Sequence, residues 1–196
     1  TVSVAAVTPP SAPWVGWSLS GMIAAQLALN APARVDKLSL MASSPRFITG
    51  NGWSYAMDPA VLAGFAQELQ EDYRGTLDRF LSLHVGLNTA AGRDTLRQLR
   101  EMLFQFPSPA PQALRDGLAI LSSADLRAQL PALRCPVLYV LGVRDRLVPA
   151  GVGAALTALL PAARIQIVTG AGHAPFLSHQ TEFLAALAAF LEPAHD

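Results

Sequence analysis

A small-residue motif near the N-terminus constrains the fold of this chain more than any other feature. Gly-Trp-Ser-Leu-Ser-Gly at residues 16–21 follows an apolar run over residues 14–17 and precedes an Ala- and Leu-rich segment over residues 21–31. This order predicts a strand, a tight turn and a helix, the setting of a nucleophile elbow that exposes its central serine. Ser18 is therefore the candidate nucleophile, with Ser20 in place of the motif's second glycine. The alternative is an ordinary turn in which Ser18 caps the helix.

Three further apolar runs, at residues 37–42, 137–142 and 164–168, predict the other strands. Three of the four runs are almost continuously apolar, which is typical of parallel strands that helices cover on both faces. Helical patterns over residues 151–160 and 181–191 follow the last two strands. The sequence thus predicts the α/β class, with a parallel sheet flanked by helices.

The segment between the second and third predicted strands holds no convincing strand. Asp58 and Pro59 predict the start of a helix, and apolar residues at helical spacing continue from Ala60 to Leu81. Further helices are predicted over residues 94–104 and 111–121. We therefore divide the chain into a core and an all-helical lid over the strand ends, where functional loops gather. The core comprises residues 1–45 and 131–196, and the lid residues 46–130.

Two residues downstream supply what a nucleophilic serine needs, a base and an acid that orients it. Asp145 follows the predicted strand at 137–142, and His173 follows the one at 164–168. Because parallel strands end at the same edge of a sheet, we expect both to lie near Ser18. Taken singly, Asp145 reads as a turn residue and His173 as a loop histidine. Their order and positions favour a catalytic triad, with the N–H of Leu19 holding the oxyanion.

Composition and charge exclude other classes of protein. Hydrophobic residues make up 52% and charged residues 14% of the chain, which excludes intrinsic disorder. A net charge of zero gives no overall positive potential that would attract nucleic acid or an anionic membrane. Residues 1–33 are uncharged, but prolines interrupt them, which argues against a membrane-spanning helix. Cys135 is the only cysteine, which excludes an intrachain disulfide and favours the cytoplasm. The sequence has no nucleotide-binding fingerprint or metal-ligand spacing, so we expect no cofactor and no metal.

The chain resembles the α/β-hydrolases over nearly its whole length, and within them the carboxylesterases of biotin biosynthesis. The resemblance rests on the motifs around the three candidate triad residues and on more specific lid motifs: Val61-Leu62-Ala63-Gly64-Phe65, Arg79-Phe80-Leu81-Ser82-Leu83 and Asp125-Leu126-Arg127. It implies hydrolysis of pimeloyl-acyl carrier protein methyl ester to pimeloyl-acyl carrier protein and methanol. It also implies a set of substrate-binding residues: Leu19, Phe80, Leu81, Ser82, Leu83 and His84. His84 stands where the resembling enzymes have glutamine.

An acyl carrier protein is acidic, so the resemblance implies a cationic docking surface on the lid. The candidates are five arginines: Arg74, Arg79, Arg93, Arg97 and Arg100. Acidic residues lie among them, and arginines on exposed helix faces are often only solvated. The resembling enzymes have an eight-stranded sheet, and this chain starts before the fifth strand. We therefore expect a fragment of a longer, monomeric protein that lacks the second oxyanion donor.

Two other hypotheses remain open from the sequence. The first is another lidded α/β-hydrolase, a general esterase or a peptidase, with the same triad and different lid contacts. The second is an inactive fragment that binds a partner through an exposed edge strand, since unpaired strand edges pair readily with other chains. Activity toward esters of different chain length distinguishes another lidded hydrolase from the pimeloyl esterase. The reactivity of Ser18 toward a fluorophosphonate probe distinguishes an active enzyme from an inactive fragment.

Overall fold

The computed structural model of the chain describes residues 9–84 and 90–192. In this part of the chain, four strands form one parallel sheet in sequence order. The strands are β1 (Ala12–Trp17), β2 (Val35–Met41), β3 (Val137–Gly142) and β4 (Arg164–Val168). All strand ends therefore point to one edge of the sheet, and the predicted parallel α/β fold is confirmed.

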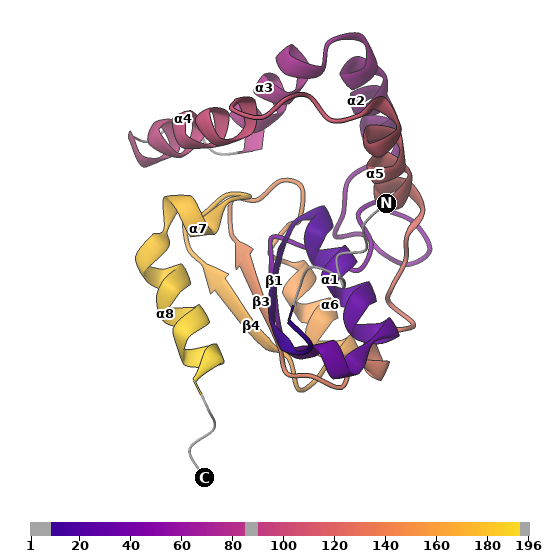
Figure 1. Cartoon of the computed structure of the whole chain (residues 1–196), viewed down its shortest axis with the longest axis vertical. Coiled ribbons are helices and arrows are strands. Elements are labelled where there is room, and N and C mark those ends of the chain that lie inside the picture. Colours follow the sequence, from indigo (N-terminus) through magenta and orange to yellow (C-terminus); the bar gives the residue numbers. More distant parts are fainter. Residues whose placement is uncertain (1–8, 85–89, 193–196) are drawn as a thin grey trace.

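Helices connect the strands and extend above them (Figure 1). The α-helices are α1 (Leu19–Asn30), α2 (Pro59–Glu71), α3 (Tyr73–His84), α4 (Ala90–Phe104), α5 (Pro111–Ser123), α6 (Val152–Leu159), α7 (Pro175–Ser178) and α8 (Gln180–Leu191). Two 3₁₀-helices, η2 (Pro32–Arg34) and η3 (Leu130–Ala132), precede β2 and β3. The helices predicted in the core agree with α1, α6 and α8 to within two residues, whereas the short α7 was not predicted.

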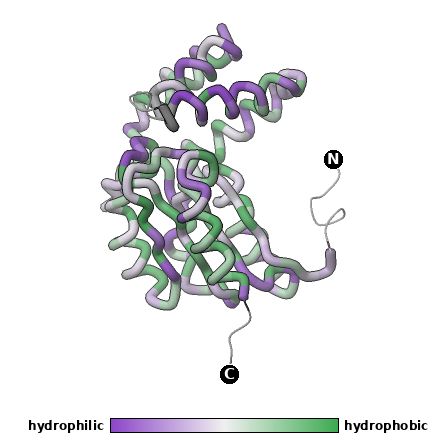
Figure 2. Tube along the Cα trace, turned by 90° about the vertical axis from the view of Figure 1, so that its left-hand side faces the viewer, coloured by the Kyte–Doolittle hydropathy of each residue, from purple (hydrophilic) through white to green (hydrophobic). Residues whose placement is uncertain are grey.

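Both faces of the sheet are covered by helices. Helices α1 and α6 share one buried cluster with Leu40 and Tyr139, and α8 shares another with Leu138 and Val140. Successive side chains of a strand point to opposite faces, so a strand covered on both sides is apolar throughout. All six residues of β3 are buried accordingly. Figure 2 shows the resulting contrast between the mostly hydrophobic core and the lid, where hydrophilic and hydrophobic residues alternate.

Helices α2 to α5 form the lid, above the edge where the strands end (Figure 1). They occupy residues 59–123, a shorter segment than the predicted all-helical 46–130. The apolar spacing from Ala60 to Leu81 spans two helices, because the helix is interrupted at Asp72. The backbone of Asp72 is non-helical, and its carboxylate accepts a hydrogen bond from the Gly75 N–H at 2.9 Å. Residues 46–58 form short bridges in place of a helix, including one between Ile48 and Met57.

The two ends of the lid segment are tied together by an ion cluster around Asp125. Arg46 donates to Asp125 Oδ2 at 3.0 Å, and Arg127 donates to both carboxylate oxygens at 2.6 and 2.8 Å. The Arg127 guanidinium also lies over the Trp53 ring, 5.4 Å from its centroid. These hydrogen bonds, chiefly those from Arg127, lower the pKa of Asp125 to about 2. The cluster therefore joins the residues before α2 to those after α5.

We predict that Asp125→Asn lowers the free energy of unfolding by about 2–3 kcal/mol at pH 7, because it leaves the largely buried Arg46 without its carboxylate. Urea titration measures this difference. Since folding lowers the pKa of Asp125, its contribution is complete above the carboxyl's ordinary pKa and disappears as the pH falls toward 2. The difference in the free energy of unfolding between Asp125→Asn and the unsubstituted chain should therefore disappear only below about pH 4.

Asp94→Asn is the matched control for this prediction. Asp94 pairs with Arg97 at 3.3 Å, and both side chains are 65% exposed. An exposed pair contributes about 0–1 kcal/mol, so this variant should unfold almost like the unsubstituted chain. Equal losses in the two variants would contradict a special role for the Asp125 cluster.

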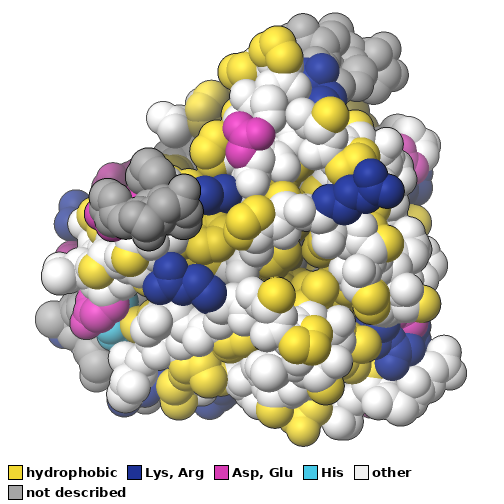
Figure 3. Space-filling model, turned by 90° about the horizontal axis from the view of Figure 1, so that it is seen from below, with side chains coloured by type: hydrophobic (Ala, Val, Ile, Leu, Met, Phe, Trp, Pro, Cys, Tyr) yellow, Lys and Arg dark blue, Asp and Glu magenta, His cyan; other side chains and the backbone are white. Residues whose placement is uncertain are grey.

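The surface away from the lid mixes side chains of all kinds. On the face shown in Figure 3, the Lys and Arg side chains stand apart from one another among apolar and uncharged groups. Within residues 9–84 and 90–192, no helix combines the length and apolar character needed to cross a membrane. The same residues contain no cluster of three or more His, Cys, Asp or Glu side chains that could hold a metal ion.

Candidate active site

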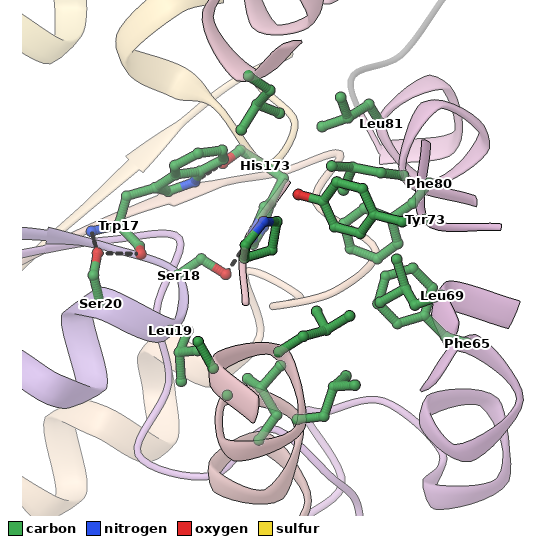
Figure 4. A pocket seen from close by; sticks show the side chains of 18 of the residues that line it. Trp17, Ser18, Leu19, Ser20, Phe65, Leu69, Tyr73, Phe80, Leu81 and His173 are labelled. Atoms are coloured by element: carbon green, nitrogen blue, oxygen red, sulfur yellow. Dashed lines mark hydrogen bonds between the residues drawn. The ribbon is translucent and has the colours of Figure 1, made fainter. Parts of the chain in front are cut away.

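Ser18 lies in the sharp turn between β1 and α1 (Figure 4). Its φ of 55° is in the left-handed region, which costs a residue other than glycine about 1–3 kcal/mol. Hydrogen bonds to β2 and to the segment that directly follows it hold this conformation. The Ser18 N–H donates to Met41 O at 2.9 Å, and Ser18 O accepts from Ser43 Oγ at 2.8 Å. The Ser18 side chain makes no capping hydrogen bond to α1, so the turn presents its hydroxyl to other partners.

Close packing explains the small residues around Ser18. A Cβ at Gly16 would lie 2.5 Å from the Gly21 Cα, and a Cβ at Gly21 would lie 2.5 Å from Ser43 Oγ. Ser20 occupies the motif's third small position, and its hydroxyl donates to Trp17 O at 2.7 Å and accepts from Trp17 N at 3.0 Å. The serine thus keeps the required small size and links the start of the helix to the end of the strand.

The structure brings Ser18, His173 and Asp145 into one chain of hydrogen bonds. His173 Nε2 lies 2.9 Å from Ser18 Oγ, and His173 Nδ1 lies 2.8 Å from Asp145 Oδ2. Asp145 and His173 are 4% and 5% exposed. The other Asp145 oxygen accepts from the N–H groups of Leu147 and Val148 at 2.8 and 3.0 Å, which fixes the orientation of the carboxylate. An Nδ1–H group that donates to Asp145 leaves Nε2 as the acceptor that faces the Ser18 hydroxyl.

Trp17 holds the histidine loop in place, a role that sequence reasoning missed. Its indole N–H donates to His173 O at 2.7 Å, and its ring lies 5.7 Å from the imidazole, centroid to centroid. Phe176 packs edge-on against the same indole at 5.2 Å. The only signal in the sequence is that Trp17 directly precedes Ser18, which does not reveal a partner 156 positions away.

The first turn of α1 supplies one candidate oxyanion donor. The Leu19 N–H lies within the first four of the helix, which have no acceptor inside the helix. The helix dipole adds positive potential at the same end, next to Ser18. A tetrahedral oxyanion formed at Ser18 can therefore be stabilised by this N–H.

A large apolar pocket opens between Ser18 and the lid (Figure 4). Its volume is about 510 Å³. Ser18, His173 and Leu19 contribute to its core side. The lid side is formed by residues from α2, α3, α4 and α5 together with Pro109: Phe65, Leu69, Tyr73, Leu77, Phe80, Leu81, Leu99, Leu103, Ala113, Leu114, Gly117, Leu118 and Leu121. Such a pocket accommodates a hydrocarbon chain whose reacting end meets Ser18.

Comparison with known proteins identifies the family. Residues 4–180 match the model of the α/β hydrolase fold family. The chain belongs to the α/β-hydrolase family. It is 46% identical over 188 residues to the pimeloyl-[acyl-carrier protein] methyl ester esterase of Xanthomonas oryzae pv. oryzae, covering 96% of this chain and 73% of that protein. Its identity with the esterase of the same name from Stenotrophomonas maltophilia is 44%, covering 96% of this chain and 72% of the relative.

Solved structures agree on the fold of this α/β-hydrolase. An esterase from Exiguobacterium antarcticum superposes with a TM-score of 0.79 at 20% identity, covering 91% of this chain and 65% of that one. An enol-lactonase from Burkholderia xenovorans gives a TM-score of 0.77 at 19% identity, covering 93% and 66% of the two chains. The chain thus spans slightly less than two thirds of the length of these structures.

The predicted substrate-binding residues divide into three groups in this α/β-hydrolase. Leu19, Phe80 and Leu81 line the large pocket. Ser82 does not line the pocket, because each residue advances about 100° around the helix and Ser82 leaves the face shared by Phe80 and Leu81. Its hydroxyl donates to Asp78 O at 2.8 Å. The side chains of Leu83 and His84 lie outside the described part of the structure. Sequence reasoning named no individual pocket residue on α2, α4 or α5, because the apolar spacing of a lid helix is typical of packing and of substrate lining alike.

The five lid arginines are partly neutralised by their neighbours. Three form ion pairs: Arg79 with Glu68 at 3.3 Å, Arg97 with Asp94 at 3.3 Å, and Arg100 with Asp78. Hydrogen bonding to Arg100 lowers the pKa of Asp78. Arg74 lies over the Phe104 ring, 5.3 Å from its centroid, and Arg93 is exposed. The lid therefore presents alternating charges, and among these five arginines Arg74 and Arg93 have no ion pair with a described residue.

Proposed function

We propose that this α/β-hydrolase is a serine carboxylesterase that hydrolyses pimeloyl-acyl carrier protein methyl ester to pimeloyl-acyl carrier protein and methanol. The observation that carries the proposal is the hydrogen-bonded chain Ser18–His173–Asp145, of which Ser18 and His173 line the apolar pocket. The curated relatives, at 44–46% identity, support the choice of substrate. The apolar walls suit its hydrocarbon chain, since each buried methylene contributes about 0.8 kcal/mol.

The geometry supports an acyl-enzyme mechanism. His173 Nε2 takes the proton of Ser18 as the serine oxygen attacks the ester carbonyl carbon, and the carbonyl oxygen becomes an oxyanion near the Leu19 N–H. When the tetrahedral intermediate collapses, the C–O bond to the methoxy group breaks and His173 gives its proton to the departing methoxide oxygen, which leaves as methanol. A water molecule, deprotonated by His173, then attacks the acyl-enzyme; the bond to the Ser18 oxygen breaks, His173 returns the proton to that oxygen, and the acid is released. Asp145 stabilises the positively charged imidazole in both steps.

The test of this proposal is methanol release from pimeloyl-acyl carrier protein methyl ester by this chain. We expect a higher kcat/KM for the seven-carbon dicarboxylic acyl chain than for carrier-bound methyl esters with much shorter or longer chains, because the pocket of about 510 Å³ buries a limited length of chain. A steady-state assay over a series of chain lengths measures this preference. Equal rates along the series would favour the general-esterase alternative.

Docking of the acidic carrier on the lid is the finer part of the proposal. Arg74 and Arg93 are its strongest candidates, because Arg79, Arg97 and Arg100 already have carboxylate partners. We predict that Arg74→Glu combined with Arg93→Glu lowers kcat/KM for the carrier-bound ester about tenfold at low ionic strength and leaves a small free ester unaffected. Arg115→Glu on α5 is the control. A loss that is equal for both substrates, or insensitive to salt, would contradict docking at these two residues.

A further inference from the structure

Tyr73 brings a polar group to the lid side of an otherwise apolar pocket. The other lid residues that line the pocket have hydrocarbon side chains, or none in the case of Gly117. Figure 4 shows the Tyr73 hydroxyl directed into the pocket toward His173. Within residues 9–84 and 90–192, this hydroxyl has no hydrogen-bond partner. The active-site pocket therefore contains a donor that the triad mechanism does not use.

The position of this hydroxyl is set by the helix break at Asp72. Asp72 ends α2, and its carboxylate and carbonyl oxygens accept from the N–H groups of Gly75 and Thr76 at 2.9 and 3.0 Å. Tyr73 is thus the first residue of a capped helix, between Leu69 and Leu77 on the pocket wall. The side chain is half-buried. Its hydroxyl is supported by regular secondary structure, which positions binding groups more accurately than a free loop does.

An unpaired hydroxyl in an apolar pocket favours some ligands over others. A bound hydrocarbon chain displaces water from the hydroxyl but has no hydrogen-bond acceptor, so the O–H donor is left unsatisfied. A chain that carries a carbonyl oxygen can accept the hydrogen bond. The groups that act on the reacting ester, Ser18, His173 and the Leu19 N–H, lie on the core side of the pocket, whereas Tyr73 lies on the lid side. This division leaves the second carbonyl oxygen of such a chain as the candidate acceptor for Tyr73.

We propose that the Tyr73 hydroxyl donates a hydrogen bond to the second carbonyl group of a dicarboxylic acyl chain and so selects such chains over monocarboxylic ones. The inference rests on the proposed esterase function and assigns a specificity residue within the same site. The hydrogen bond exists in the bound ground state as well as in the transition state, so it should act mainly on KM.

Two methyl esters with seven-carbon acyl chains test this inference. Dimethyl pimelate carries a second carbonyl, and methyl heptanoate does not. We expect Tyr73→Phe to raise KM for dimethyl pimelate about fivefold to tenfold, leave its kcat unchanged and leave methyl heptanoate unaffected. The phenylalanine keeps the ring, so packing is retained. Tyr55→Phe is the matched control, because Tyr55 is 38% exposed and does not line the large pocket.

Binding measurements make the outcome independent of turnover. Calorimetric titration of Ser18→Ala, with and without Tyr73→Phe, compares the affinities for the same two esters. A preference for dimethyl pimelate that disappears with the hydroxyl supports the inference even if the chain hydrolyses neither ester, a result that would count against the proposed function alone. The same ratio of affinities in both variants, or an equal loss for both esters, would overturn the role of Tyr73.

Discussion

Ser18→Ala should abolish methanol release, with kcat reduced by about 10⁵–10⁶-fold, because no other group can form the acyl-enzyme once the nucleophilic oxygen is lost. The remaining groups, His173 as a base and the Leu19 N–H as a donor, can only direct a water molecule against the ester. Steady-state assay of the carrier-bound methyl ester measures the loss. Labelling with a fluorophosphonate probe, which reacts with activated serines, should disappear in parallel.

The control for this substitution is Ser122→Ala. Ser122 lies on α5, and its hydroxyl donates only to Ala119 O within the helix. Its loss should leave turnover unchanged, and urea titration should show both variants to be folded. Retained activity in Ser18→Ala would contradict the assignment of the nucleophile. A folded, unsubstituted chain that neither turns over nor reacts with the probe would instead favour the inactive-fragment hypothesis.

Asp145→Asn should lower kcat by about 10⁴-fold while leaving the fold intact. The asparagine fills the same volume and its oxygen can still accept from the Leu147 and Val148 N–H groups. Its NH₂ group then faces His173 Nδ1, which favours the tautomer with the proton on Nε2. That nitrogen can no longer accept the proton of Ser18, so the chemical step fails although substrate binding continues.

The readout for Asp145→Asn is kcat and KM measured separately, together with the pH profile. We expect KM to stay within a few-fold of the original value, since Asp145 does not line the pocket. Asp116→Asn on α5, where the carboxylate accepts only from Gln112, serves as the control. A loss of less than about tenfold would indicate that Asp145 does not orient the histidine, and the acid would have to be sought elsewhere.

The sequence alone was sufficient for the features that depend on local spacing. The close approach of strand and helix at residues 16–21 requires small side chains, so the position of Ser18 could be predicted from those residues. The continuously apolar runs follow from helices on both faces of the sheet. Parallel strands end at one edge, so the order of Ser18, Asp145 and His173 along the chain already predicted that they lie together.

Only the tertiary structure showed which helix faces line the pocket and which charged side chains pair with each other. Periodicity shows that a face of α2 or α4 is buried, but it does not distinguish packing against a neighbour from lining a pocket. The break at Asp72 was hidden because the apolar spacing continues on either side of it. The ion pair of Arg100 with Asp78 joins residues 22 positions apart, and that of Arg46 with Asp125 joins residues 79 positions apart. Such contacts depend on the angles between packed elements, which local spacing does not encode.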